Sequence, residues 1–330
     1  MSDGAGEPWF AGIDVGGTGI RIALARSGRP ASLEAARTAE LAAPARITAA
    51  GHDGEALLAA VLPALRGLLD AAGAAGAEAV AVGATGMALL GRDLAARLPG
   101  PLARETGARY LALASDAVTA HIGALGTRHG VVVAGGTGLV AVGSHPAEGW
   151  RRADGWGQLL GDCGGGAWIG RAGLEAALRQ HDGRAGGSAA LLALAAEEFG
   201  PVAGLPAALQ PRADRAGLLA GFAPAVGRAA AEGDPVAALV LDRAAEEIAA
   251  SATAAAAGLP SPHLCLTGGL FRLPGLADAV RRHVAAHLPD ARWTAPDGPP
   301  LLGALRLASA LPSPPWPPSP PLLDVLTLGG

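Results

Sequence analysis

Two amino acids are absent from this chain: its 330 residues include no Lys and no Asn, so all 25 basic residues are Arg. Without Lys, the chain can form neither a G-x-x-x-x-G-K-[ST] phosphate loop nor a lysine Schiff base. Without Asn there is no N-glycosylation site, and a protein-kinase centre, which needs both residues, is excluded. Any phosphate chemistry must therefore rely on other groups.

Aromatic side chains, cysteine and net charge are also scarce. The chain has one Tyr, four Phe and a formal net charge of -4, and its arginines are scattered, which disfavours a nucleic-acid groove. Its two cysteines, Cys163 and Cys265, form no C-x-x-C pair and indicate a reduced, cytoplasmic protein. No signal peptide is evident, and prolines interrupt the longest uncharged stretch, 248–271, so no membrane span is expected.

What the chain has in quantity is glycine, and two glycine-rich segments look alike. An apolar run at 10–13 leads through Asp14 to Gly16-Gly17-Thr18-Gly19 and then to an alternating segment, 20–24. The same order of strand, Gly-Gly-Thr-Gly tip and strand returns at 130–142. Both segments predict β-hairpins, and their likeness indicates an internal repeat at the scale of a domain.

The other segments alternate between helical and strand patterns, which is typical of an α/β protein. Buried strands are expected at 79–84, 110–114 and 263–267. Helices are expected at 54–72, 116–125, 167–181, 188–199, 213–232, 235–258, 275–287 and 301–311. Seven prolines between 312 and 321 exclude helix and central strand there and predict a tail or a strap.

A hairpin tip made of glycines can place several backbone N–H groups around an anion without obstruction by side chains. A single tip of this kind is equally explained by the preference of tight hairpin turns for Gly, but two matching tips favour a polyphosphate site. Each tip includes a Thr hydroxyl, and Arg21 adds a cation near the first. The residues expected to bind phosphate are Gly16, Gly17, Thr18, Gly19, Arg21, Gly136, Thr137 and Gly138.

Two aspartates follow predicted strands. Asp14 precedes the first tip, where a carboxylate would face phosphates, so it predicts Mg²⁺ held through water; a turn-initiating Asp is the alternative. Asp116 follows the strand at 110–114 and could be a general base, because sites form at the carboxyl ends of strands in α/β proteins. Alternatively, Ser115 or Asp116 is simply the helix N-cap.

A third group of residues suits a sugar. Asp162 lies among glycines and could bind hydroxyls, or it could be a turn residue. Glu175, on the following helix, could reach the same region or be an exposed helix residue. Indole rings such as that of Trp156 stack on pyranose faces. The residues expected at the sugar are Asp116, Thr137, Gly138, Trp156, Gly157, Asp162 and Glu175.

Five ordered segments together resemble the motifs of the actin-like ATPase superfamily of sugar kinases. In turn they resemble its first phosphate motif, first connecting helix, second phosphate motif, adenosine motif and second connecting helix. The segments are Phe10–Leu24, Ala112–Gly126, Gly130–Val142, Leu264–Leu270 and Pro300–Ala304. The resemblance covers nearly the whole chain and implies a two-lobed α/β fold, actin-like or ribonuclease H-like, with ATP in a central cleft.

Within that superfamily, three further segments resemble the N-acetylglucosamine kinase group, which also contains BadF-type dehydratase-activating ATPases. These segments are Gly155-Trp156-Gly157, Gly161-Asp162 and Ala167-Trp168-Ile169-Gly170. The activators hold an iron–sulfur cluster, a pattern that Cys163 and Cys265 do not match. The cysteine-rich zinc motif of the ROK sugar kinases is also absent.

The resemblance implies Asp116 as the base, Asp14 for Mg²⁺ and Asp162 on the sugar, with Gly268 and Gly269 against the adenosine. One departure concerns the sugar: Leu139-Val140 stand where N-acetylglucosamine kinases have Ser-Asn, polar residues that help to hold the acetylated substrate. The chain is therefore more similar to bacterial glucosamine kinases. The amino group of glucosamine is cationic near neutral pH, and the carboxylates of Asp162 and Glu175 would complement its charge.

We expect an enzyme that phosphorylates glucosamine at its 6-hydroxyl, with ATP as co-substrate and Mg²⁺ as cofactor. A kinase for N-acetylglucosamine or glucose, and a non-catalytic sugar or nucleotide sensor, stay open. The smaller lobe is expected to comprise residues 1–115 and about 300–330, and the larger lobe 116–299. The expected partners are ATP and a small amino sugar, with a homodimer left open and with neither nucleic acid nor membrane.

Overall fold

The computed structural model describes residues 7–16, 19–26, 33, 36–42, 47–48, 51–87, 91–146, 148–210, 212 and 214–328. The chain divides into two compact units. Unit 1 contains Met1–His129, Ser144–Trp150 and Ala295–Gly330, and unit 2 contains Gly130–Gly143 and Arg151–Thr294.

Unit 1 is built on a six-stranded sheet in the order β13-β7-β6-β1-β2-β3. Strands β1 and β2 pair antiparallel, which confirms the first predicted hairpin, while β1, β6 and β7 run parallel. Strands β3 and β13 were not predicted. The strands are β1 (Trp9–Val15), β2 (Ile20–Arg26), β3 (Arg37–Leu41), β6 (Ala79–Ala84), β7 (Tyr110–Ser115) and β13 (Leu323–Thr327), with β4 (Ile47–Thr48) and β5 (Gly51–His52) forming a separate pair.

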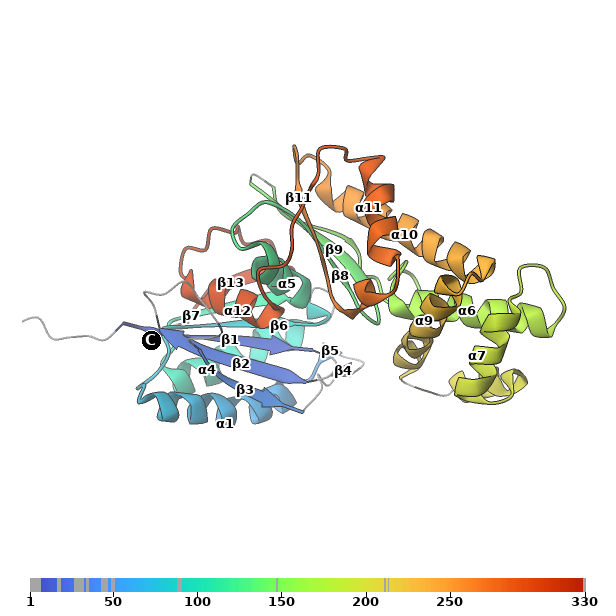
Figure 1. Ribbon diagram of the computed structural model, residues 1–330. Coiled ribbons are helices and arrows are strands. Elements are labelled where there is room, and N and C mark those ends of the chain that lie inside the picture. The colour runs from blue at the N-terminus through green and yellow to red at the C-terminus, as the bar shows by residue number, and fades with distance from the viewer. Residues whose placement is uncertain are drawn as a thin grey trace, which may run out of the picture. The chain divides into compact units, whose positions relative to one another are not determined.

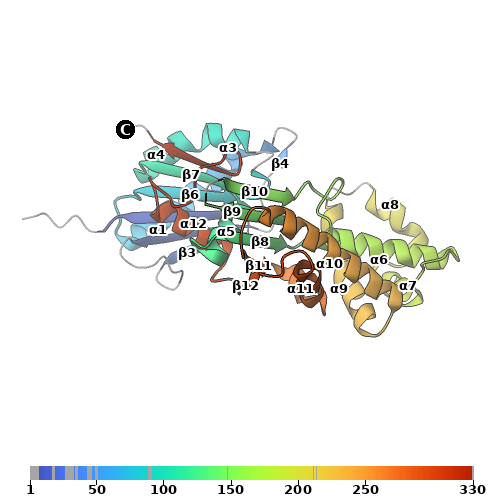
Figure 2. The same cartoon turned by 90° about the horizontal axis from the view of Figure 1, so that it is seen from above.

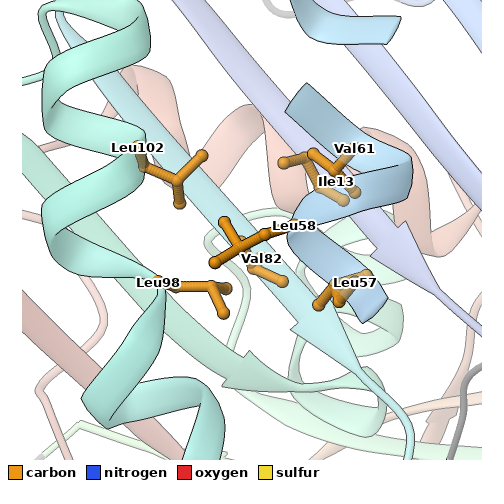
Figure 3. Close-up of a pocket in the computed structure, with 7 residues that line it drawn as sticks. All are labelled: Ile13, Leu57, Leu58, Val61, Val82, Leu98 and Leu102. Atoms are coloured by element: carbon orange, nitrogen blue, oxygen red, sulfur yellow. The ribbon is translucent and has the colours of Figure 1, made fainter. Parts of the chain in front are cut away.

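Helices α1 (Gly54–Ala72) and α4 (Pro99–Thr106) cover one face of this sheet, and α3 (Arg92–Arg97) leads into α4 (Figure 1). Helix α1 begins where Asp53 accepts the N–H of Ala56 and ends at Gly73 in the left-handed conformation, so both ends have the expected caps. Ile13 of β1 points toward these helices and lines a small apolar pocket with Val82 and side chains of α1 and the α4 region (Figure 3). This pocket has no polar lining and is a packing feature of the core.

Helices α5 (Asp116–Leu125) and α12 (Pro300–Ser309) cover the opposite face (Figure 1). Side chains alternate along a strand, so Asp14 points to this face because Ile13 points to the other. Every residue of α5 after Asp116 is buried, as expected for a helix that is apolar all round. The two helices pack closely because Gly303 has no side chain: a Cβ there would collide with the carbonyl oxygen of Thr119.

Unit 2 is built mainly on a five-stranded sheet in the order β10-β9-β8-β11-β12, with β8 and β11 parallel. These strands are β8 (Gly130–Gly135), β9 (Leu139–His145), β10 (Gly149–Asp154), β11 (His263–Thr267) and β12 (Arg292–Trp293). The helices are α6 (Gly166–His181), α7 (Ala189–Phe199), α8 (Leu205–Leu209), α9 (Arg215–Ala231), α10 (Pro235–Ala256) and α11 (Leu276–Ala285), with short turns η2 (Val202–Gly204) and η3 (Gly269–Arg272). Figures 1 and 2 both show α6 beside α9 and α10 beside α11.

Most predicted helices are present with limits shifted by a few residues at most. The units differ from the sequence-based lobes in that α5 belongs to unit 1, because it packs on α12 and the first sheet. The prolines of 312–321 form turns and no helix, as expected, and lead into β13 at the edge of the sheet. In the described part of the chain no single helix could cross a membrane, whereas one bent pair, Ala189–Phe199 with Val202–Leu209, meets the length and composition criteria.

Candidate active site

The predicted site residues fall into two sets, one in each unit. Unit 1 holds Asp14, Gly16, Gly17, Thr18, Gly19, Arg21 and Asp116, whereas unit 2 holds Gly136, Thr137, Gly138, Trp156, Gly157, Asp162, Glu175, Gly268 and Gly269. Gly17 and Thr18 lie outside the described residues. Each set is described within its own unit.

The first tip closes where the N–H of Gly16 donates to the carbonyl oxygen of Gly19, at 3.0 Å. Asp14 and Arg21 stand opposite each other on β1 and β2, so their side chains share one face of the hairpin. The guanidinium Nη1 of Arg21 lies 3.6 Å from Asp14 Oδ2, and its Nε donates to Glu40 at 3.0 Å. Arg21 is thus tied to two carboxylates and half exposed beside the tip.

Asp14 is a buried carboxylate with only one nearby cation among these contacts. Burial raises its pKa from 3.8 to about 6; the Arg21 guanidinium opposes this rise and the neighbouring charge of Asp116 adds to it. The environment therefore disfavours the negative charge, and an added cation would relieve it. This arrangement fits the expected magnesium ligand, although no group of three or more His, Cys, Asp or Glu suited to a metal occurs within the described ranges.

Asp116 is the first residue of α5, directly after β7. The parallel strands β1, β6 and β7 end at the same edge of the sheet, with Val15, Ala84 and Ser115 in register. The N-cap of α5 is Ser115, whose hydroxyl accepts the N–H of Val118. The sequence did not decide whether Ser115 or Asp116 caps this helix. Because Ser115 is the N-cap, the Asp116 carboxylate is not needed as the cap.

Thr85 is a functional candidate that the sequence analysis missed. It follows β6, its N–H donates to the carbonyl oxygen of Val15, and its hydroxyl donates to Asp116 Oδ2. The other oxygen, Oδ1, accepts the N–H of Ala117 at 2.9 Å. The hydroxyl therefore orients the Asp116 carboxylate at the edge where Asp14 lies. The available sequence signal was a Thr-Gly pair directly after a buried strand.

In unit 2, the second tip is bound to the start of α6. The N–H groups of Gly166 and Ala167 donate to the carbonyl oxygens of Gly136 and Thr137, at 2.9 and 2.8 Å. Gly138 directly faces the Asp162 carboxylate, and a Cβ at Gly138 would collide with it. The tip and Asp162 are therefore neighbours, as the assignment of both to one substrate requires.

The loop that holds Asp162 is organised by Asp154, a second residue that the sequence analysis missed. The carboxylate of Asp154 accepts the N–H groups of Asp162 and Cys163, each at 2.7 Å. The Asp162 carboxylate in turn accepts N–H groups of Gly157 and Leu139. Burial raises the pKa of Asp162, and these two hydrogen bonds oppose the rise. A single Asp at the end of a strand offers no sequence signal that distinguishes it from a turn residue.

The remaining predicted sugar residues lie on the surface. The Trp156 side chain is exposed, with the Arg152 guanidinium 4.3 Å from the ring centroid. Glu175 is exposed on α6 and forms an ion pair with Arg171, at 3.5 Å. Arg171 itself lines a shallow hollow together with Asp162. The charge of Glu175 is thus already partly balanced by a protein cation.

Gly268 and Gly269 follow β11, the strand parallel to β8. Gly268 has a φ of 101° and packs directly on Gly135, the last residue of β8, where a Cβ would collide with the Gly135 carbonyl. A Cβ at Gly269 would meet nothing within 4 Å. The predicted adenosine segment thus lies beside the second tip and presents open backbone, as a flat nucleoside would need.

Solved structures share this fold. The putative N-acetylglucosamine kinase of Chromobacterium violaceum is 29% identical with a TM-score of 0.67, over 91% of this chain and 98% of that chain. The putative N-acetylglucosamine kinase of Porphyromonas gingivalis is 16% identical with a TM-score of 0.65, over 90% and 97%. A ROK family glucokinase of Streptomyces griseus, solved with glucose and AMPPNP, is 20% identical with a TM-score of 0.53, over 91% and 99%. The class is therefore an actin-like ATPase with the fold of sugar kinases, as predicted.

The chain belongs to the BadF/BadG/BcrA/BcrD ATPase family, whose model matches residues 11–307. A shorter match, 37% identical over 70 residues, links it to the N-acetylmuramic acid/N-acetylglucosamine kinase of Clostridium acetobutylicum. That match spans 21% of this chain and 23% of the curated relative. At the level of class, the prediction of a phosphotransferase of the sugar-kinase type is confirmed.

Proposed function

We propose that the chain transfers the γ-phosphoryl group of ATP to the 6-hydroxyl of an amino sugar, with glucosamine as the substrate. The observation that carries this proposal is the meeting of Asp14, Thr85 and Asp116 at the carboxyl edge of β1, β6 and β7, beside a glycine tip. This edge offers a carboxylate suited to a cation and a second, oriented carboxylate suited to a proton.

Asp116 acts as the general base in this proposal. It accepts the proton of the 6-hydroxyl as that oxygen attacks the γ-phosphorus and the bond to ADP breaks. Thr85 orients the carboxylate by its hydrogen bond to Oδ2. Asp14 would hold the Mg²⁺ that accompanies ATP, and this ion would neutralise part of the charge of the phosphates.

Backbone N–H groups bind the phosphates, which explains how a chain without Lys handles them. The residues assigned to phosphate are Gly16, Gly17, Thr18, Gly19, Arg21, Gly136, Thr137 and Gly138. Gly268 and Gly269 are assigned to the adenosine. The sugar is assigned to Asp116, Thr137, Gly138, Trp156, Gly157, Asp162 and Glu175.

N-Acetylglucosamine is the second candidate substrate, and the ion pair of Glu175 with Arg171 favours it. A carboxylate already paired with Arg attracts a cationic amino group less than a free one. The names of the relatives from Chromobacterium violaceum and Clostridium acetobutylicum point the same way. Glucosamine is supported by Leu139-Val140, two apolar residues after the second tip that offer no side-chain hydrogen bond to an acetyl group.

A coupled assay of ADP release with glucosamine, N-acetylglucosamine, glucose and no sugar tests the proposal. We expect sugar-dependent release, highest kcat/KM for glucosamine, and its loss in Asp116→Asn. No sugar-dependent release would instead support a non-catalytic sensor.

A pair of variants tests the amino-sugar contact. Glu175→Ala should lower glucosamine turnover far more than glucose turnover, whereas Glu197→Ala, an exposed helix glutamate in α7, should change neither. Equal losses for both sugars in Glu175→Ala would count against a contact between Glu175 and the amino group.

A further inference from the structure

Both ends of α5, the helix that begins with Asp116, are bound by the C-terminal part of the chain. At its start, the N–H of Ser115 donates to the carbonyl oxygen of Leu322 at 2.9 Å, and β13 then pairs antiparallel with β7 from Leu323 onward. This contact lies immediately before Asp116. The same C-terminal segment reaches the other end of the helix through Trp316.

The carbonyl groups at the end of α5 all find partners, most of them from the C-terminal part. Arg306 donates to the carbonyl oxygens of Ile122 and Gly123, at 3.1 Å each. The N–H of Asp297 donates to Ala124 at 3.0 Å, and the indole Nε1 of Trp316 donates to Gly126 at 3.2 Å. Trp316 is 4% exposed, so its bond is protected from competition by water. The last carbonyl groups of a helix lack intrahelical N–H donors, and these hydrogen bonds supply donors to them.

The segment between the two anchors is short and rich in proline. From Trp316 to Leu322 there are six residue steps, and the chain turns at their end: the N–H of Leu322 donates to Ser319, and Ser319 forms a β-bridge with Leu323. Ser115 and Gly126 are eleven steps apart along the helix, or about 16 Å. One short segment thus contacts both ends of the helix, and its turn together with the four prolines at 317, 318, 320 and 321 restricts its backbone.

We propose that the proline-rich segment 312–321, anchored by Trp316, is a positioning element that sets where α5 begins and thus where Asp116 presents its carboxylate. The proposal rests on the proposed function through the role of Asp116. It assigns a task to a part of the chain that holds none of the residues assigned to nucleotide or sugar.

The test compares Trp316→Phe, which keeps a buried ring but removes the N–H donor, with Trp9→Phe as a control in the same unit. Trp9 lies at the far end of β1 from Asp14, where Arg26 covers its ring. Steady-state kinetics and hydrogen exchange of the α5 amides are measured at a temperature where circular dichroism shows each variant folded. A second variant, Pro317→Ala with Pro318→Ala, loosens the segment with both anchors kept and replaces Trp316→Phe if that variant does not fold.

We expect Trp316→Phe to lower kcat about three- to tenfold, the usual effect of one lost hydrogen bond, with KM for ATP and sugar unchanged. Hydrogen exchange of the α5 amides should become faster in Trp316→Phe. Trp9→Phe should match the wild type in kcat and in the exchange of the α5 amides. Unchanged kcat, even with a lowered Tm, would show a purely structural role and overturn the proposal. If wild-type protein shows no sugar-dependent ADP release, the proposed function fails, and the exchange measurement alone decides: unchanged α5 protection in Trp316→Phe overturns the positioning role, and raised exchange supports it.

Discussion

Replacement of Asp14 by Asn should stabilise the protein in the absence of nucleotide and metal. The carboxylate is buried on β1, and its pKa is raised from 3.8 to about 6, mainly by burial. A raised pKa means that the folded state holds the charged form at a cost. Asn has nearly the same shape without the charge, so the variant avoids this cost while it loses the proposed metal ligand.

The size of the effect follows from the shift. A rise of about two pKa units corresponds to about 3 kcal/mol in the free energy of unfolding once Asp14 is fully ionised. For a domain of this size, that free energy corresponds to a rise in Tm of about 5–10 °C. The Arg21 guanidinium, 3.6 Å away, already reduces the shift, so its attraction is included in this value.

The pH dependence has a definite sign. Below about pH 4, Asp14 is mostly protonated in both the folded and the unfolded chain. The buried charge then costs the wild type nothing, so it gives no difference in the free energy of unfolding between wild type and Asp14→Asn. The wild type then loses stability relative to the variant as the pH rises from about 4 to 6, and the difference is constant above about pH 7.

Urea unfolding between pH 4 and pH 8 with EDTA measures this difference. Asp93→Asn is the matched control in unit 1, because hydrogen bonds from Arg97 and from the N–H of Gly54 lower the pKa of Asp93. The control should therefore show the opposite sign: wild type is more stable than Asp93→Asn, and this difference is nearly constant above about pH 4. The reasoning is refuted if Asp14→Asn is less stable than wild type at pH 8, or if the difference does not change with pH.

Three further predictions concern the base, its orientation and the helix that bears it. Asp116→Asn should lower kcat by about 10²–10⁴ with nucleotide affinity retained, as measured by calorimetry and the ADP assay; near-normal turnover would remove Asp116 as the base. Thr85→Val should lower kcat several-fold because it removes the hydroxyl that donates to Asp116, whereas Thr85→Ser keeps this donor and should keep kcat near the wild-type value. Equal losses of kcat in both variants would argue for a packing role instead. Gly303→Ala should destabilise the protein by about 1–3 kcal/mol in urea unfolding, because its Cβ would collide with the Thr119 carbonyl. Gly67→Ala, at an open position of α1, should instead stabilise by about 0.5–1 kcal/mol, and equal effects at both glycines would contradict the steric argument.

Local patterns predicted much of the fold. The strands β1, β2, β6 and β7 and the helices α1 and α5 follow from apolar runs, alternation and caps that act within a few residues. Strand β3 escaped prediction because its residues are mostly exposed and two of them, Arg37 and Glu40, are charged. Strand β13 escaped because a short strand after seven prolines is stabilised by its pairing with β7, a contact with residues more than 200 positions earlier.

The candidate site divides in the same way. Asp14, Asp116 and the glycine tips were visible because each lies near the end of a strand or between two strands. Thr85 and Asp154 were not, because their importance lies in which atoms they bind: a carboxylate 31 residues later in one case, and two N–H groups in the other. A hydrogen bond between distant residues leaves no periodic trace in the sequence.

The sequence by itself determined the class of this protein through the five ordered segments that resemble the actin-like motifs. The absence of Lys excludes the commonest phosphate loop, and the two matching glycine tips supply another means of binding phosphate. Only the tertiary structure decided that Asp14, Thr85 and Asp116 meet, since the parallel pairing of β1, β6 and β7 brings their ends to one edge. It also decided the environment of Asp14. Burial and a neighbouring carboxylate raise its pKa, and both depend on residues that only folding brings together.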